Sequence, residues 1–261
     1  MKLRVLGCAG SESPGRKSPA FLVDDVLLLD GGTIGAVLTQ EGQNQITDVL
    51  LSHPHHDHVR GLPSFADNLA VAGRRDPVTI HGSATTLGAV QKHLFNGVIW
   101  PDFSRLPCAE EPIIRWQPVV PLVDFQVRDY LVTAFPVKHS VPAFAYRLQR
   151  EEVSLLYTGD MGPTPELWPA IGTLTALIVE VSFPDELEAL AQKTGHLTAA
   201  LLAKELALLP HLPAQILVCH LKPIYEEQIR REVAALKIPG LSFLSDDQEF
   251  SLFRPPALLP A

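Results

Sequence analysis

The residues best suited to chemistry lie in one short stretch, positions 53–58, which reads HPHHDH. Neutral imidazoles and carboxylates are the usual ligands of a catalytic zinc ion, which keeps one coordination position open for water. A single histidine here would be explained as well by a solvated polar loop or by helix capping. The density of ligand-type residues, directly after an apolar run, favours metal binding instead. Because His53 and His55 are followed so closely by Asp57 and His58, one loop could serve two neighbouring metal ions.

Three further residues of ligand type, His139, Asp160 and His220, each follow an apolar run that we expect to be a strand. These runs span 131–138, 155–159 and 215–219. Read singly, the three would be a core histidine, a turn aspartate and a helix cap. Because they recur at strand ends after the first cluster, they predict one site built by loops along one edge of the fold.

His196 lies in the segment 194–198, which reads TGHLT, just before a helix expected to begin near residue 198. The free backbone N–H groups at a helix N-terminus favour an anion such as a phosphoryl oxygen. A surface histidine beside a capping threonine is the alternative. The position therefore indicates a group that could act on a phosphate near the metals.

The elements that must position these residues alternate between strand and helix patterns. The runs 20–23 and 26–29 flank Asp24-Asp25, a turn pair that predicts a hairpin. We expect the proline-rich stretch 101–121 to form a loop-bearing strand pair. Other strands are expected at 1–7, 47–52, 78–81, 131–137, 143–148, 153–157, 177–181, 215–219 and 241–244, and helices after Ser83, from about 198 to 209 and from about 226 to 236. This pattern suits an α/β sandwich with helices outside two sheets.

The composition limits what the protein can be. At 261 residues and 46% hydrophobic, the chain can bury a full core, so we expect one α/β domain over residues 1–261. The formal net charge of −8 argues against a broad nucleic-acid surface. The three cysteines form no C-x-x-C pattern, and no apolar run reaches the ~20 residues that span a bilayer. With no signal-peptide pattern at the N-terminus, we expect a cytoplasmic protein without membrane contact.

The H-x-H-x-D-H cluster and the later ligand-type residues resemble the metallo-β-lactamase superfamily, from residue 6 to residue 220. The resemblance implies a four-layer αββα sandwich and two divalent metal ions, with zinc expected and manganese or iron as alternatives. One metal would take His53, His55 and His139, the other Asp57, His58 and His220, and Asp160 would bridge them. His56 departs from the pattern, and we interpret it as a residue that binds no metal.

Four segments, 138–139 (KH), 179–184 (VEVSFP), 194–198 (TGHLT) and 220–223 (HLKP), resemble the class II 3′,5′-cyclic-nucleotide phosphodiesterases. This resemblance implies hydrolysis of cAMP or cGMP, a small-molecule phosphodiester, to a nucleoside 5′-monophosphate by a hydroxide that bridges the metals. Asp57, His196 and Glu180 would be catalytic, with Glu180 orienting His196 as general acid. Lys222 and His196 would contact the substrate phosphate. A homodimer is compatible with this family.

A second reading is the tRNA 3′-processing ribonuclease branch, because the segment 139–147 (HSVPAFAYR) resembles its post-ligand segment. Against it, His220 is followed by Leu221-Lys222-Pro223 where that branch has Ser and then Arg-Tyr. The sequence also lacks a long Gly/Lys-rich arm for tRNA. A third reading, a non-catalytic metal-binding protein on this fold, conflicts with the complete ligand set. Four charged residues are interpreted as solvated surface: Lys204, Glu205, Asp185 and Glu186.

Overall fold

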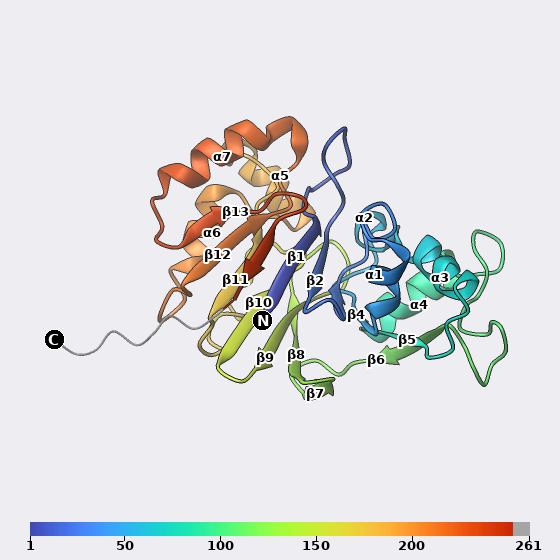
Figure 1. Cartoon of the computed structure of the whole chain (residues 1–261). Helices are drawn as coiled ribbons and strands as arrows, with labels where there is room; N and C mark the ends of the chain where they lie inside the picture. The colour runs from blue at the N-terminus through green and yellow to red at the C-terminus, as the bar shows by residue number, and fades with distance from the viewer. Residues whose placement is uncertain (253–261) are drawn as a thin grey trace.

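Two seven-stranded β-sheets lie face to face, and helices cover the outer face of each sheet (Figure 1). The structure is a computed structural model, and it describes residues 1–252, so residues 253–261 of the expected domain lie outside the described part. The first sheet has the order β14-β1-β2-β3-β4-β5-β6 and the second β13-β12-β11-β10-β9-β8-β7. The expected four-layer αββα sandwich is thereby confirmed.

The strands of the first sheet are β1 (Lys2–Gly7), β2 (Ala20–Val23), β3 (Leu27–Leu29), β4 (Asp48–Leu50), β5 (Val78–Gly82), β6 (Ile114–Pro118) and β14 (Glu249–Ser251). Those of the second are β7 (Asp124–Val127), β8 (Tyr130–Val137), β9 (Ala143–Arg150), β10 (Val153–Tyr157), β11 (Ala176–Glu180), β12 (Gln215–Cys219) and β13 (Leu241–Phe243). Within each sheet four strands run parallel, β3 to β6 and β10 to β13. Residues that follow parallel strands therefore meet at one edge.

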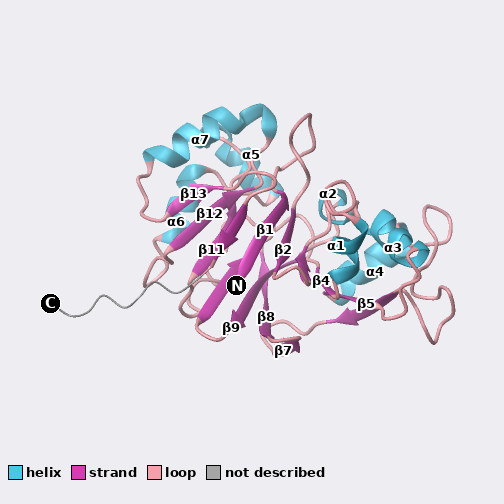
Figure 2. Ribbon diagram, in the orientation of Figure 1, coloured by secondary structure: helices cyan, strands magenta, loops and turns pink. Residues whose placement is uncertain are grey.

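The helices fall into two groups, which Figure 2 shows in cyan on either side of the sheets. The first sheet carries α1 (Gln40–Gln45), α2 (His56–Val59), α3 (Leu62–Val71) and α4 (Ala84–His93). The second carries α5 (Glu188–Thr194), α6 (Ala199–Leu206) and α7 (Glu226–Ala235), with the 3₁₀ helices η1 (Asp185–Leu187) and η2 (Pro223–Tyr225). No helix among residues 1–252 is both long enough and apolar enough to cross a membrane.

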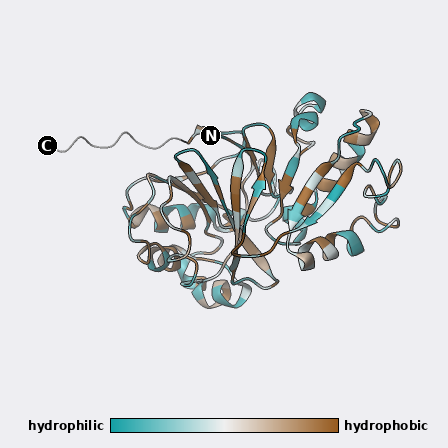
Figure 3. Cartoon of the chain, turned by 90° about the horizontal axis from the view of Figure 1, so that it is seen from below, coloured by the Kyte–Doolittle hydropathy of each residue, from teal (hydrophilic) through white to brown (hydrophobic). Residues whose placement is uncertain are grey.

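Three apolar cores hold the four layers together. One lies between the sheets and includes Phe21, Tyr146 and Tyr157, whereas the other two lie between each sheet and its helices. In the parallel strand β11 all five residues are buried, as expected where both faces of a sheet are covered. Figure 3 shows brown, hydrophobic residues along many of the strands, with teal, hydrophilic residues on loops, on helices and on parts of other strands.

The hairpin expected around Asp24-Asp25 is confirmed, since β2 pairs antiparallel with β3. Both aspartates have positive φ, 47° and 62°. The loop is one residue longer than expected, because Val23 pairs with Leu27 and β3 begins only at Leu27. The strand pair expected at 101–121 is wrong. That stretch contains one named strand, β6, at the edge of the first sheet, and an isolated bridge between Pro107 and Pro112. Proline has no N–H to donate, so a stretch this rich in proline cannot sustain a second ladder.

The interpretation of Glu205 as solvated surface is also wrong. Its side chain is buried, with the residue only 4% exposed, and Oε2 accepts hydrogen bonds from Trp168 Nε1 at 2.7 Å and Thr164 N at 2.9 Å. Lys204 and Glu186 are exposed as expected. Asp185 is half-buried, and its Oδ1 accepts from Ala200 N at the start of α6, a role that the solvated interpretation missed.

Candidate metal centre

The seven expected metal ligands meet at the edge where the parallel strands of both sheets end. Two clusters have ligand atoms within 4.8 Å of one another: His53, His55, His139 and Asp160 in the first, and Asp57, His58 and His220 in the second. A third cluster of this kind joins Asp160 and His220 to His196. His53 to His58 come from the end of β4, whereas His139, Asp160 and His220 follow β8, β10 and β12.

In the first cluster the ring nitrogens point at one another. His55 Nδ1 lies 2.9 Å from His53 Nε2 and 3.1 Å from His139 Nε2. Asp160 Oδ2 lies 3.8 Å from His53 Nε2. His55 therefore presents Nδ1 to the centre, whereas its two partners present Nε2.

In the second cluster His58 Nε2 and His220 Nε2 are 3.4 Å apart, and each is 3.3 Å from Asp160 Oδ1. Asp57 Oδ2 completes it, 3.5 Å from His220 Nε2. Burial alone would raise the pKa of Asp57, but its bond to His220 and the charges of His58 and His220 hold the pKa well below the usual value. Asp160 directs one carboxylate oxygen to each cluster, which is the arrangement of a bridging ligand.

In four of the five histidine rings the outer nitrogen has a hydrogen-bond partner, and this partner determines whether the inner nitrogen carries a proton or a lone pair. The Nδ1 atoms of His53, His58, His139 and His220 lie 2.7–3.0 Å from Ser52 Oγ, Asp30 Oδ2, Gly195 O and Ser182 Oγ respectively. The two serines already give their protons to Asp30 and Glu180, so each accepts from its histidine. With Nδ1–H donated outward, a neutral ring points the lone pair of Nε2 inward.

These converging lone pairs test whether metals fit. His58 Nε2 and His220 Nε2 carry no proton in these tautomers, so they cannot hydrogen-bond to each other at 3.4 Å, but they can share a cation. His55 Nδ1 lies within 3.1 Å of His53 Nε2 and His139 Nε2, close enough for the three nitrogens to bind a second cation. A set of five imidazoles with two carboxylates is typical of zinc and similar transition ions, whereas magnesium and calcium prefer oxygen. The residues therefore fit two divalent transition-metal ions.

Asp30 is the main functional residue that the sequence reasoning missed. It is fully buried after β3, and it accepts from Ser52 N, Ser52 Oγ, Tyr157 OH and His58 Nδ1 at 2.6–2.7 Å. Burial and the neighbouring Asp30 raise the pKa of Tyr157 well above its usual value, so its hydroxyl remains a donor. The only sequence signal was Asp30-Gly31-Gly32 at a strand end. A Cβ on Gly32 would lie 2.0 Å from Asp57 O, so glycine is needed there for the close approach to the ligand loop.

His196 lies beside the clusters and bonds to Glu180, with 2.7 Å between Nδ1 and Oε1. Its ring stacks on that of His220, and its Nδ1 is 4.0 Å from Asp160 Oδ2. Burial lowers the pKa of His196, but the charge and hydrogen bond of Glu180 outweigh burial and raise the pKa overall. Glu180 is fully buried at the end of β11. His196 precedes Thr198, the N-cap of α6, by two residues.

The remaining residues named from the sequence lie at the rim. Lys222 Nζ lies 3.2 Å from Gly10 O and 5.3 Å from the centre of the Phe183 ring. His56 is exposed as the first residue of α2 and belongs to none of the three clusters. The segment that begins at His220 is hydrogen-bonded to the residue that follows β1, because His220 N donates to Cys8 O at 2.7 Å.

A family model matches residues 34–221, and it describes a beta-lactamase superfamily domain. The chain belongs to the metallo-β-lactamase superfamily and is a member of a family of metal-dependent hydrolases.

Within the superfamily it is similar to proteins of two kinds. It is 28% identical to the ribonuclease Z of Pyrobaculum aerophilum, over 97% of this chain and 99% of that one. It is 26% identical to a probable 3′,5′-cyclic-nucleotide phosphodiesterase of Yersinia pestis, over 74% of this chain and 63% of that one. Unliganded yeast PDE1 has the same fold, with a TM-score of 0.80 at 18% identity over 95% of this chain and 98% of that chain.

Proposed function

We propose that this protein is a two-metal phosphodiesterase whose preferred substrates are 3′,5′-cyclic nucleotides. One observation carries the proposal: Asp160 directs one carboxylate oxygen to each cluster of metal ligands, directly beside the buried Glu180–His196 pair. Two-metal sites with a shared ligand are typical of enzymes that hydrolyse phosphate esters. A proton donor beside such a site suits a poor leaving group.

Two divalent ions, with zinc expected and manganese or iron as alternatives, would polarise a phosphoryl oxygen and lower the pKa of a bound water. His53, His55 and His139 would hold one ion, Asp57, His58 and His220 the other, and Asp160 both. The protein's own contribution is to fix the rings in place, because Asp30, Ser52, Ser182 and Gly195 O hold the outer nitrogens. Ligands that cannot rotate keep the site at the spacing that the reaction needs.

His196 would donate a proton to the departing O3′ of the ribose. Its Nδ1 is engaged by Glu180, so Nε2 is the nitrogen available to the substrate. The negative charge of Glu180 favours the protonated ring, which is the form a general acid needs. Lys222 Nζ, which donates to Gly10 O in the structure, would contact a phosphate oxygen of the substrate.

The charge of the chain supports a small substrate. Its formal net charge is −8, which disfavours a long polyanion. The match to a probable cyclic-nucleotide phosphodiesterase is consistent with the preferred substrate.

RNA processing at the 3′ end of precursor tRNA is the second candidate. The observation that favours it is the ribonuclease Z match over nearly the full length of both chains. The metal clusters and the Glu180–His196 pair suit both candidates equally, since each reaction cleaves a phosphodiester. The substrate must therefore be decided by assay.

The test is a side-by-side assay of zinc-loaded protein with cyclic AMP, cyclic GMP, a linear dinucleotide, a precursor tRNA and a β-lactam. We expect kcat/KM to be highest for a cyclic nucleotide and the β-lactam to be untouched. Precursor-tRNA cleavage far above cyclic-nucleotide turnover would reject cyclic nucleotides as the preferred substrates in favour of tRNA 3′-end processing. A protein that holds two metals and hydrolyses none of the phosphodiesters would overturn the phosphodiesterase proposal itself.

A further inference from the structure

A hollow of about 270 Å³ adjoins the metal centre on the side of His139. Three segments that are distant in the sequence form it: the end of β8, the loop after Asp160, and the end of α5. Its lining consists of Lys138, His139, Ser140, Gly162, Pro163, Gln192, Lys193 and Gly195. This volume is just below the range of about 300–1,000 Å³ for pockets of drug-sized ligands, so the hollow fits part of a substrate and not a separate ligand.

The hollow shares a residue with the first metal cluster and adjoins His196 in the sequence. His139 lines it and also belongs to the first metal cluster. Gly195 lines it too, accepts from His139 Nδ1 through its carbonyl, and directly precedes His196. A Cβ on Gly195 would lie 2.7 Å from His139 Cα, so the two segments are in close contact. A group bound here would lie beside a phosphodiester held at the metals.

The charge of the hollow is positive, in contrast to the acidic chain. Its lining contains two lysines and no carboxylate. Lys138 pairs with Glu166 at 3.0 Å, but Lys193 is exposed and has no ion-pair partner among residues 1–252. Ser140 and Gln192 add hydroxyl and amide groups that can donate hydrogen bonds.

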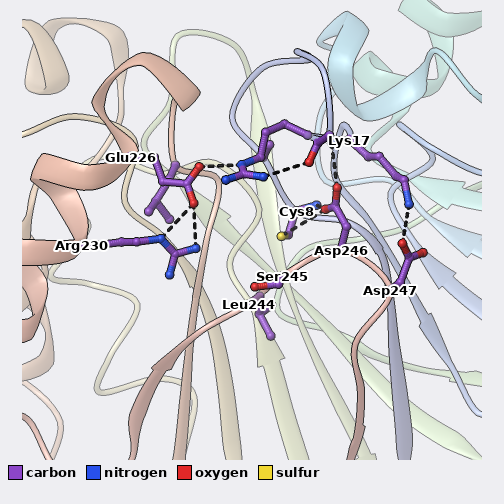
Figure 4. A pocket seen from close by; sticks show the side chains of 12 residues that line it. Cys8, Lys17, Glu226, Arg230, Leu244, Ser245, Asp246 and Asp247 are labelled. Atoms are coloured by element: carbon purple, nitrogen blue, oxygen red, sulfur yellow. Dashed lines mark hydrogen bonds and ion pairs between the residues drawn. The ribbon is translucent and has the colours of Figure 1, made fainter.

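The hollow drawn in Figure 4, which is lined by Leu221, Glu226 and Asp246 among others, differs in this respect. Its three cations are all matched, because Arg16 and Arg230 both bond to Glu226, and Lys17 bonds to Asp247. Asp246 there accepts from backbone N–H groups of Cys8 and Lys17. An anion entering that hollow would have to displace existing ion pairs, whereas Lys193 requires no displacement.

We propose that the hollow beside His139 binds a second phosphate group of the substrate, with Lys193 as the residue that recognises it. The site would then accept linear phosphodiesters with a further phosphate next to the scissile one, a substrate class beyond simple cyclic nucleotides. The inference rests on the proposed function for the phosphate that occupies the metals, but it can be tested by binding alone.

The test is calorimetric binding of adenosine 3′,5′-bisphosphate, 5′-AMP and 3′-AMP to the zinc-loaded protein at low salt. Wild type should bind the bisphosphate more tightly than either monophosphate, since one phosphate lies at the metals and the other in the hollow. In Lys193→Ala the ratio of bisphosphate affinity to the better monophosphate affinity should fall about five- to tenfold, as for loss of one partly exposed charged hydrogen bond. Lys193→Arg should preserve most of the ratio.

Lys92→Ala is the matched control, because Lys92 is also exposed in the last turn of a helix but does not line the hollow. Its affinity ratio should equal that of wild type. Equal binding of bisphosphate and monophosphates by wild type would overturn the proposal, as would an unchanged ratio in Lys193→Ala. The assay needs no turnover, so a bisphosphate preference without phosphodiester hydrolysis would keep this site and reject only the proposed function.

Discussion

His196 offers the most direct test of mechanism at the scale of single residues. A ribose O3′ leaves as a strongly basic alkoxide, so a positioned acid should contribute about 10²–10⁴-fold to the rate. A nitrophenolate leaves without such help. His196→Ala should therefore keep both metals, lose most of its kcat on a cyclic nucleotide, and lose much less on a nitrophenyl phosphodiester. Steady-state kinetics on both substrates, with metal content measured for each sample, check this.

If His196 only binds phosphate, the two substrates should suffer alike and chiefly in KM, because uniform binding leaves kcat unchanged. That result would remove the general-acid role.

Glu180→Gln tests the partner of this histidine through the pH profile of kcat. Glu180 raises the pKa of His196 in the folded protein, and the protonated ring is the active form. Removing the negative charge lowers that pKa, so the protonated form is lost at a lower pH. The alkaline limb of the profile should shift to lower pH relative to wild type, whereas a purely structural role would lower kcat without moving the limb.

Metal analysis separates ligands from neighbours within the HPHHDH stretch. His56 is exposed and lies in none of the clusters, so His56→Ala should retain two metals per chain, as should the distant control His93→Ala. His53→Ala and His220→Ala should each lose metal, because each removes an inward-facing nitrogen. Equal loss in His56→Ala would show that the ligand assignment is mistaken.

The sequence predicted those parts of the site in which several metal-ligand residue types lie close together. Histidines at strand ends identified the clusters that the structure brings together. Asp30, Ser52 and Ser182 could not be predicted, because small polar residues end many strands and turns. Their part is visible only when a histidine from another segment lies within hydrogen-bond distance.

Glu205 belongs to the scale of elements, because it ties α6 to the loop that follows Asp160. Glu205→Ala leaves Trp168 Nε1 and Thr164 N buried without their acceptor, which should cost about 1–3 kcal/mol of unfolding free energy. Urea unfolding of the variant measures this loss. Lys204→Ala, at a side chain 65% exposed, should change stability by less than about 0.5 kcal/mol. Similar values for both variants would mean that the buried carboxylate contributes nothing to stability.

Most elements with a strong local sequence pattern were predicted from the sequence, whereas most elements without such a pattern were missed. The buried parallel strands read as continuous apolar runs, and the Asp24-Asp25 turn has its own signature. No element was expected at α1, α5 or β14, which are short. The helix α3 was also missed, although its buried Leu62, Phe65, Ala66 and Leu69 have helical spacing. The strand β14 also pairs with β1 from the opposite end of the chain, so no local signal could reveal it.

At the scale of the whole molecule, the metal centre joins the two sheets. The HPHHDH ligands follow a strand of the first sheet, and His139, Asp160 and His220 follow strands of the second. Each metal that binds only the folded protein adds about 2.7 kcal/mol to its stability at a hundred times Kd, so two metals add about 5 kcal/mol. Chelation should therefore lower Tm by about 10–20 °C, and added zinc should restore it. A calorimetric scan that gives the same Tm with and without verified metal would contradict this.

The pairing of β14 with β1 brings the two ends of the described chain into contact. Leu252 N donates to Met1 O at 2.8 Å, and the amino terminus lies 3.3 Å from Leu252 O. The backbone from residue 1 to residue 252 therefore forms nearly a closed ring, and its two ends meet far from the catalytic edge. A circular permutant could join residue 252 to residue 1 through a short linker and open instead at Gly73, an exposed turn after α3. Every metal ligand would keep its place in such a rewired chain.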